Sequence, residues 1–233
     1  GFAKGNNIGI KKATGNIICL INTDVEIVKG CIKELLINLK LDSSVGIVAP
    51  QALNIDGSIQ KTARKELTLF NSLVLSMGLN KLLPITTEYS HKRIECVDIV
   101  AGCFWMIRRD ALESVGFLDD SFFFYGEDRD YCKRMNENGW KIVYYPFAKI
   151  YHLNGGSSKS DTFKYNIYLE RAYIQYWNKY YSGLKLKSLI VLRILYHLVR
   201  IGANSFAFII SAGLLKRAKN KVLRSWFCIL VLT

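Results

Sequence analysis

The first fifty residues alternate short, uninterrupted apolar runs with a helical pattern. The runs are NIICLIN at 16–22 and VGIVA at 45–49, and apolar residues recur at helical spacing over 28–39. Such short apolar runs are typical of strands buried on both faces, as in a parallel sheet covered by helices. The strand, helix, strand order indicates a crossover unit. We therefore predict an α/β fold with a mostly parallel sheet flanked by helices.

Further elements follow along the chain. An Asp-Gly pair at 56–57 predicts a hairpin turn. Residues 97–107 form a strong strand pattern, and the short helical segment after it is closed by Gly116. A helix is predicted over 127–138, with acids in its first turn. The next strand, WKIVYYP, is expected to stop at Pro146.

The net charge of +13 comes mostly from the end of the chain. Residues 171–233 hold 11 of the 32 Lys and Arg and none of the 19 Asp and Glu, and they are strongly apolar, as in LIVLRILYHLVRI. This combination suits an anionic bilayer surface better than a nucleic acid. No apolar run reaches the roughly 18 residues of a membrane span. We expect a catalytic domain at 1–158 and a basic, apolar helical tail at 159–233, bound peripherally to the cytoplasmic face of the membrane.

Basic residues recur on one side of the predicted tail helix. Arg193, His197 and Arg200 stand at i, i+4 and i+7 and predict a stripe that faces lipid headgroups. The alternative is a set of helices packed on a core. A second basic cluster consists of Lys216, Arg217, Lys219, Lys221 and Arg224.

The six cysteines form no CxxC pair and no regular spacing. This distribution supports neither a zinc ribbon nor a disulfide framework. We interpret the cysteines as reduced, mostly buried thiols of a cytosol-facing protein.

The segment FFFYGED at 122–128 places four aromatic residues directly before two acids. Glu127 and Asp128 could simply be first-turn acids that suit the helix dipole. The rings and Gly126 favour a second interpretation, because an exposed helix start needs no apolar wall and glycine lets a bound group approach the backbone. We predict an apolar wall with carboxylates at its rim.

Asp24 and His152 each follow a predicted strand. A carboxylate at the carboxyl edge of a sheet can hold Mg²⁺ or Mn²⁺ against a phosphate, and histidine is a common metal ligand. Asp24 could also shape a turn or cap a helix, and a single histidine is more often structural. On spacing alone the structural interpretation is favoured.

Two long stretches resemble glycosyltransferase family 2, in its rhamnosyltransferase-like branch. They are GFAKGNNIGIKKATGNIICLINTDV and VAGCFWMIRRDALESVGFLDDSFFFYGEDRDYCKRMNENGWKIVYYPFAKIYHLNGGS, and with the spacing between them they cover about 1–158. The resemblance implies a GT-A fold, a nucleotide-sugar donor, a glycan or lipid-linked acceptor of envelope polysaccharide synthesis, and transfer with inversion. It also implies that the family's opening strand and base-binding loop precede Gly1.

The resemblance assigns roles to particular residues. It implies Asp128 as general base with Glu127 beside it, and Asp24 with His152 as ligands of a divalent cation. Donor contacts are expected at Asn7, Asn22, Asp24 and Gly102. The aromatic and acidic residues themselves predict acceptor contacts at Phe124, Tyr125 and Glu127, because ring faces pack against sugars while carboxylates reach their hydroxyls. Asn22 stands where many relatives carry the first acid of an Asp-x-Asp motif, which leaves one carboxylate for the metal. There is no QxxRW stretch, so the chain differs from the processive polymer synthases.

These assignments give one geometric expectation and two alternatives. Asp24 and His152 should approach within the coordination sphere of one ion.

The first alternative function is a nucleotidyltransferase of similar fold, which would need a Gly-rich, Arg-containing loop near its own start. The second is a non-catalytic, membrane-bound adaptor, which nucleotide sugar and Mn²⁺ would not stabilise.

Overall fold

The computed structural model describes residues 1–79, 82–83, 87–153, 162–210 and 216–232. The chain forms two compact units. The first comprises Gly1–Glu66 and Thr86–Ser160, and the second comprises Leu67–Ile85 and Asp161–Thr233. The boundary expected after residue 158 lies outside the described residues.

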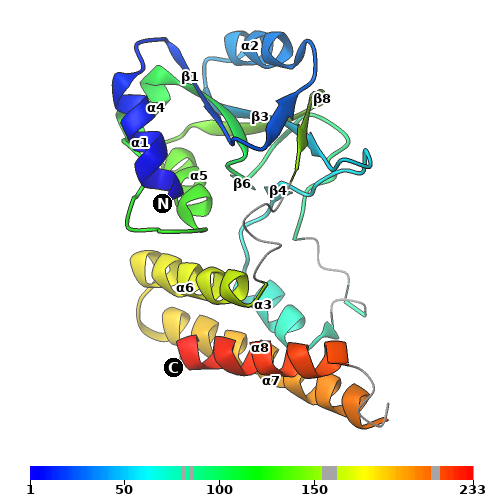
Figure 1. The fold of residues 1–233 in the computed structure, drawn as a ribbon. Helices are drawn as coiled ribbons and strands as arrows, with labels where there is room; N and C mark the ends of the chain where they lie inside the picture. The colour runs from blue at the N-terminus through cyan, green and yellow to red at the C-terminus, as the bar shows by residue number, and fades with distance from the viewer. Residues whose placement is uncertain (80–81, 84–86, 154–161, 211–215, 233) are drawn as a thin grey trace. The chain divides into compact units, whose positions relative to one another are not determined.

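A mixed β-sheet is the centre of the first unit (Figure 1). Its strands, in spatial order, are β1 (Ile17–Ile21), β7 (Phe104–Arg108), β3 (Val45–Leu53), β8 (Lys141–His152) and β2 (Val25–Ile27), and β5 (Glu95–Cys96) also pairs with β8. The strands β4 (Ala63–Arg64) and β6 (Ile99–Val100) form a separate pair.

The predicted α/β class is confirmed, but the sheet is mixed rather than mostly parallel. Among the pairings described, β3 with β8 is parallel, whereas β1 with β7, β7 with β3, β8 with β2 and β8 with β5 are antiparallel. The strands β1 and β3 do run in the same direction, as the crossover pattern predicted. However, β7 lies between them and runs antiparallel to both, and nothing in the first fifty residues indicates this insertion.

Helices cover both faces of this sheet (Figure 1). The helix α2 (Cys31–Leu41) packs on one face, and α1 (Phe2–Lys12), α4 (Arg109–Val115) and α5 (Glu127–Glu137) pack on the other. Side chains alternate between the two cores along β7, because successive residues of a strand point to opposite faces. Phe104 and Met106 lie in the core beneath α2, and Trp105 and Ile107 lie in the opposite core.

Two strand predictions need correction. The pattern at 97–107 is not one strand, because the chain turns at 101–103 and leaves β6 for the main sheet at β7. Pro146 does not end its strand, since β8 continues to His152. The pairing with β3 passes from Pro50–Tyr145 to Gln51–Lys149. This register shift leaves Pro146 outside the paired residues, so the strand can continue past it.

The second unit is helical. It contains α3 (Leu69–Ser76), α6 (Thr162–Tyr180), α7 (Gly183–Ile210) and α8 (Lys216–Leu232). Contacts join α3 to α7, α6 to α7 and α8, and α7 to α8. None of the helices, in the part of the chain that the structure describes, is long and apolar enough to cross a membrane.

The predicted basic stripe on α7 is wrong. Arg193 makes two hydrogen bonds with the buried carboxylate of Glu170, of 2.8 and 2.7 Å, and His197 is buried with its Nε2 3.2 Å from the same carboxylate. A buried acid needs such partners, because an unpaired charge in the interior is very costly. Only Arg200 of the three is exposed. The side chains of Lys216 and Arg217 lie outside what the structure describes.

Candidate active site

Asp24 and His152 meet at one edge of the main sheet. The pairing of β2 with β8 places Val25 opposite His152, and the N–H of Leu153 donates to the Asp24 carbonyl at 2.9 Å. This register brings the Nε2 atom of His152 to 3.3 Å from Oδ1 of Asp24. The expected approach of these two side chains is confirmed. Their role as metal ligands stays a prediction.

The geometry of this pair fits a divalent cation. Two ligands at right angles around Mg²⁺, each about 2.1 Å from the ion, are about 3.0 Å apart, and the observed 3.3 Å is close to that separation. Asp24 keeps about a third of its side chain exposed, whereas His152 is nearly covered. A cation held here would therefore have open positions on its solvent side for the oxygens of a diphosphate.

Backbone groups, not the Asp24 side chain, make the turn before β2. The N–H of Asn22 donates to the Cys103 carbonyl at 3.0 Å, and the Asn22 carbonyl accepts from Val25 at 3.2 Å. Asp24 joins β8 through its own carbonyl. Because these bonds use backbone groups, the Asp24 carboxylate is available for chemistry.

Glu127 and Asp128 open α5 in different environments. Gly126 adopts the left-handed conformation with φ of 89°, and Tyr125 before it also has positive φ, at 64°. Positive φ is uncommon for a residue other than glycine, and such strain is concentrated at functional sites. The sharp turn buries Glu127, whose side chain lies in the interior, while Asp128 stays partly exposed.

The Glu127 carboxyl holds its proton more strongly than a free glutamic acid does. Burial, followed by the negative charge of Asp128, raises the pKa of Glu127 to about 8. Its Oε2 atom is buried and makes no hydrogen bond with the described residues. Asp128 accepts a hydrogen bond from the backbone N–H of Arg129 at 2.8 Å. Asp128 is consequently the acid of the pair that solvent or a substrate can reach.

Cys103 links the two halves of the site. Burial raises the pKa of the Cys103 thiol to about 12, and the charges of Asp128 and Asp24 both raise it as well. The chain around Cys103 contacts both halves: its carbonyl accepts from the N–H of Asn22 at 3.0 Å, and the Val100 carbonyl just before it accepts from the Cys132 thiol of α5 at 3.7 Å. The fold brings together residues that are about a hundred positions apart in sequence.

The four aromatic residues do not form one continuous wall. Phe122 belongs to the buried core and Phe123 is mostly exposed. Phe124 and Tyr125, both partly buried, pack edge to face with ring centroids 5.2 Å apart. The Phe123 ring also contacts Phe124, with centroids 6.1 Å apart, so three rings lie in series before the acids. The contact of Phe124 and Tyr125 with an acceptor stays a prediction.

Asn7 and Gly102 occupy packed positions. The Asn7 side chain donates to the Leu118 carbonyl at 2.8 Å and accepts from the Leu118 N–H at 3.1 Å, so it braces the loop before α5. Gly102 lies in the turn before β7, where an added Cβ would come within 3.4 Å of the Phe2 ring. Neither placement tests the predicted donor contacts, which stay predictions.

Sequence reasoning missed Gln60 and Asp130. Gln60 is buried and its Oε1 lies 2.9 Å from Nδ1 of His152. Asp130 is fully buried and pairs at 2.9 Å with Arg134, which also donates to the carbonyls of Val115 and Phe117. The i, i+4 spacing of Asp130 and Arg134 was a usable signal. Gln60 had none, because its partner is 92 residues away.

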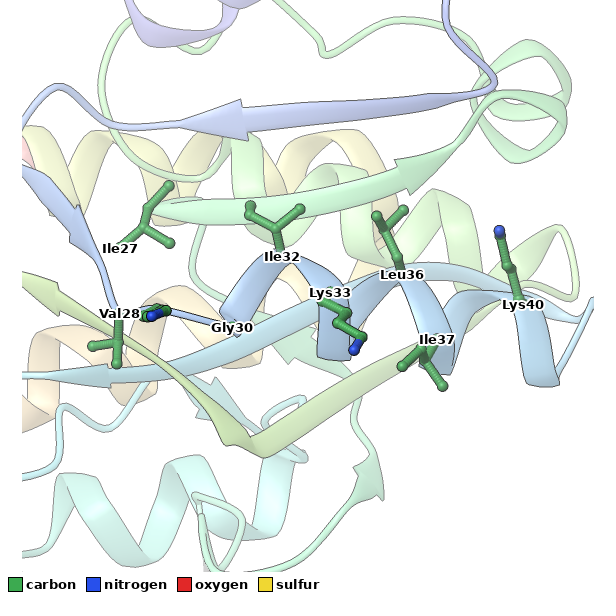
Figure 2. Close-up of a pocket in the computed structure, with 9 residues that line it drawn as sticks. Ile27, Val28, Gly30, Ile32, Lys33, Leu36, Ile37 and Lys40 are labelled. Atoms are coloured by element: carbon green, nitrogen blue, oxygen red, sulfur yellow. The ribbon is translucent and has the colours of Figure 1, made fainter.

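A shallow groove of about 550 Å³ lies elsewhere on this unit, along α2 and the end of β2 (Figure 2). The described residues that line it are apolar or lysine, with no acid and no histidine, and they include Ile32, Leu36 and Lys40. The described lining therefore lacks the carboxylate and imidazole groups that hold a divalent cation, and the candidate site is the Asp24, His152 and Asp128 region.

Comparisons with known families cover the whole chain. The model described as "Glycosyl transferase family group 2" matches residues 63–233, and the model described as "Glycosyl transferase family 2" matches residues 1–116.

Two curated relatives show the level of similarity. The low-salt glycan biosynthesis hexosyltransferase of Haloferax volcanii is 27% identical over 175 residues, which are 73% of this chain and 54% of that protein. The N-acetylglucosaminyl-diphospho-decaprenol L-rhamnosyltransferase of Mycobacterium tuberculosis is 30% identical over 155 residues, which are 62% of this chain and 49% of that protein. The chain spans about half the length of these relatives.

A solved structure shares the fold. It is a mannosyltransferase of Pyrobaculum calidifontis in complex with GDP-Man and Mn²⁺, with a TM-score of 0.54 and 14% identity over 99% of this chain and 65% of that one. This likeness confirms the GT-A-like α/β fold.

Proposed function

This chain belongs to glycosyltransferase family 2, and we propose that it moves a sugar from a nucleotide-activated donor to a hydroxyl of a glycan or lipid-linked acceptor, with inversion. The observation that carries the proposal is the contact between Asp24 and His152, whose Oδ1 and Nε2 atoms lie 3.3 Å apart at one edge of the main sheet. This pair would hold a diphosphate-bound cation, and the partly exposed Asp128 in the first turn of α5 would accept the proton.

The roles of the residues follow from the chemistry of the transfer. A sugar hydroxyl is a weak nucleophile, so a base within hydrogen-bond reach has to take its proton as it attacks the anomeric carbon. Asp128 takes this proton, and Glu127 beside it, whose protonated form is favoured by burial, can donate or accept hydrogen bonds to the acceptor. One displacement with one base inverts the anomeric carbon. A Mg²⁺ or Mn²⁺ ion held by Asp24 and His152 would supply positive charge to the departing diphosphate.

The relatives support the finer parts of the proposal. The name of the mycobacterial protein states a rhamnosyl transfer with N-acetylglucosaminyl-diphospho-decaprenol, and the solved mannosyltransferase was bound to GDP-Man and Mn²⁺. A rhamnose or hexose donor and a lipid-linked acceptor of envelope polysaccharide synthesis are consistent with these activities.

A panel of nucleotide sugars tests the proposed function. The natural protein is incubated with UDP, dTDP and GDP sugars, with Mn²⁺ or with EDTA, and released nucleoside diphosphate is measured. We expect metal-dependent hydrolysis or transfer with one donor family and little with the others. Absence of binding and turnover for every donor would support the adaptor interpretation, and release of pyrophosphate from a sugar phosphate and a nucleoside triphosphate would support the nucleotidyltransferase.

The helical unit is proposed to hold the enzyme at the cytoplasmic face of the membrane as a peripheral protein. Phe206, Ile209 and Ile210, near the end of α7, are each about two-thirds exposed or more. No acid occurs after Glu170, and 11 basic residues do. Exposed apolar side chains on a cationic, acid-free segment match an anionic bilayer in both charge and polarity.

Flotation with liposomes tests the membrane proposal. The chain should float with vesicles that contain phosphatidylglycerol and less with phosphatidylcholine alone. Replacing Phe206 and Ile209 by serine should reduce the floated fraction severalfold. Leu41 and Ile55 in the other unit are even more exposed, at 80% and 75%, and their double serine variant is the matched control. Equal flotation of the two variants would contradict the proposal.

A further inference from the structure

Gln60 is a buried amide beside the proposed metal pair. It follows a turn in which the N–H of Asn54 donates to the Ser58 carbonyl at 2.8 Å, and its own N–H donates to the Ala52 carbonyl at 2.8 Å. The turn thus folds the chain back onto the end of β3. Gln60 keeps 8% of its surface exposed, so its amide needs partners within the protein.

A backbone carbonyl fixes which end of the Gln60 amide faces which partner. Nε2 lies 2.6 Å from the carbonyl oxygen of His152 and 2.9 Å from Oδ1 of Asn54. A carbonyl oxygen only accepts hydrogen bonds, so the group facing it has to be the NH₂ donor. The amide oxygen Oε1 therefore faces the His152 ring, 2.9 Å from Nδ1.

A second turn contact holds Asn54 in the matching orientation. Nδ2 of Asn54 donates to Oγ of Ser58 at 2.8 Å, and Oγ donates to Oδ1 of Asp56 at 2.6 Å. The Ser58 hydroxyl hydrogen points at the Asp56 carboxylate, so its oxygen is free to accept from Asn54. Oδ1 of Asn54 is then available to Gln60. The donors and acceptors run in one direction from His152 to Asp56.

This direction determines the tautomer of His152. Because Oε1 of Gln60 is an acceptor, Nδ1 has to carry the hydrogen, and a neutral imidazole carries only one. Nε2 then presents a lone pair toward Oδ1 of Asp24, 3.3 Å away. Two electron-pair donors at that separation suit a shared cation. Metal-bound histidines commonly donate their other N–H to such a partner, and loss of the partner costs about 10–100-fold in metal affinity.

We propose that Gln60 is a positioning residue that holds His152 as the Nδ1–H tautomer, so that Nε2 is offered to a divalent cation shared with Asp24. The inference rests on the proposed function for its metal. The tautomer itself is a property of the metal-free chain and is measurable there.

Nitrogen NMR of ¹⁵N-histidine-labelled chain tests the tautomer without metal. The spectrum is recorded at a pH high enough for a neutral imidazole, and the His152 signals are assigned by their loss in His152→Ala. We expect Nδ1 to be the protonated nitrogen of His152. In Gln60→Met, which keeps the volume and removes the acceptor, the proton should shift toward Nε2, where Asp24 can accept it.

Mn²⁺ titration of the same samples gives the second readout, with an expected 10–100-fold loss of affinity in Gln60→Met. Gln51→Met is the matched control, because Gln51 is equally buried and donates to the His91 carbonyl. It should change neither readout.

The outcomes separate the two proposals. A wild-type chain with the proton on Nε2 overturns the role of Gln60, and this result is available even where Gln60→Met does not fold. An unchanged tautomer in folded Gln60→Met overturns it too. Failure of the wild-type chain to bind Mn²⁺, with the expected tautomer and its shift in Gln60→Met, overturns the metal site and leaves the role of Gln60 in setting the tautomer standing.

Discussion

Asp128→Asn lowers the turnover of the natural enzyme by about a hundredfold or more, which is the scale expected for loss of a general base. Asparagine keeps the shape of aspartate but cannot take a proton. The pairing of Asp24 with His152 does not involve Asp128, so donor binding should change little. A fall in kcat with a nearly unchanged donor KM is the measured signature, because proton transfer matters only in the transition state.

Glu127→Gln is the matched control for this experiment. Burial and the charge of Asp128 raise the pKa of Glu127, which favours its protonated form, and glutamine imitates that form. Turnover at pH 7 should stay within a few-fold of wild type, with any loss appearing in the acceptor KM. The pH dependence gives a further check, since ionisation of Glu127 above about pH 8 adds a charge next to Asp128 in the wild type and not in the variant.

The reverse result would reassign the base. If Glu127→Gln lost activity while Asp128→Asn kept it, Glu127 would be the proton acceptor, with a pKa close to the working pH as suits a base. Near-normal turnover in both variants would remove α5 from the chemistry altogether.

The local elements of the first unit could be predicted from sequence, because their causes are local. Apolar runs, an Asp-Gly turn and acids at a helix start each depend on a few neighbouring residues. The meeting of Asp24 and His152 was also predictable, since each follows a strand and strand ends gather at sheet edges. The approach of Asp24 to His152 could therefore be predicted from short local sequence patterns.

The predictions that failed, and the residues that were missed, depend on contacts between residues far apart in sequence. The insertion of β7 between β1 and β3 depends on pairing across about sixty residues with β3 and about ninety with β1, and no periodicity within these strands indicates it. Arg193 looked like a surface charge because its buried partner, Glu170, is 23 positions earlier. Gln60 is recognisable only once the fold places it beside His152. In each case a long-range contact decides the role of a residue whose local sequence is unremarkable.

Asp24→Ala abolishes metal-dependent transfer, and a loss of about a thousandfold in kcat/KM is expected if the cation supplies several kcal/mol of charge stabilisation. Asp24 is the one carboxylate in the Asn22-Thr23-Asp24 stretch, and alanine leaves His152 as the only protein ligand of the pair. Since the turn before β2 is made by backbone groups, including the Asp24 carbonyl, the variant should keep its fold. The free energy of unfolding, measured without metal, should be the same for this variant as for the wild type.

His152→Ala is the graded comparison for Asp24→Ala. A neutral imidazole contributes less than a carboxylate to holding a hard cation, and diphosphate oxygens can take its place, so the loss of Mn²⁺ affinity should be smaller. Titration of Mn²⁺ with and without nucleoside diphosphate measures both variants, and added diphosphate should recover much of the affinity of His152→Ala but little of that of Asp24→Ala. If Asp24→Ala bound Mn²⁺ as tightly as wild type and kept its metal-dependent turnover, the cation would have to be held elsewhere, and the 3.3 Å contact with His152 would be an ordinary ion pair.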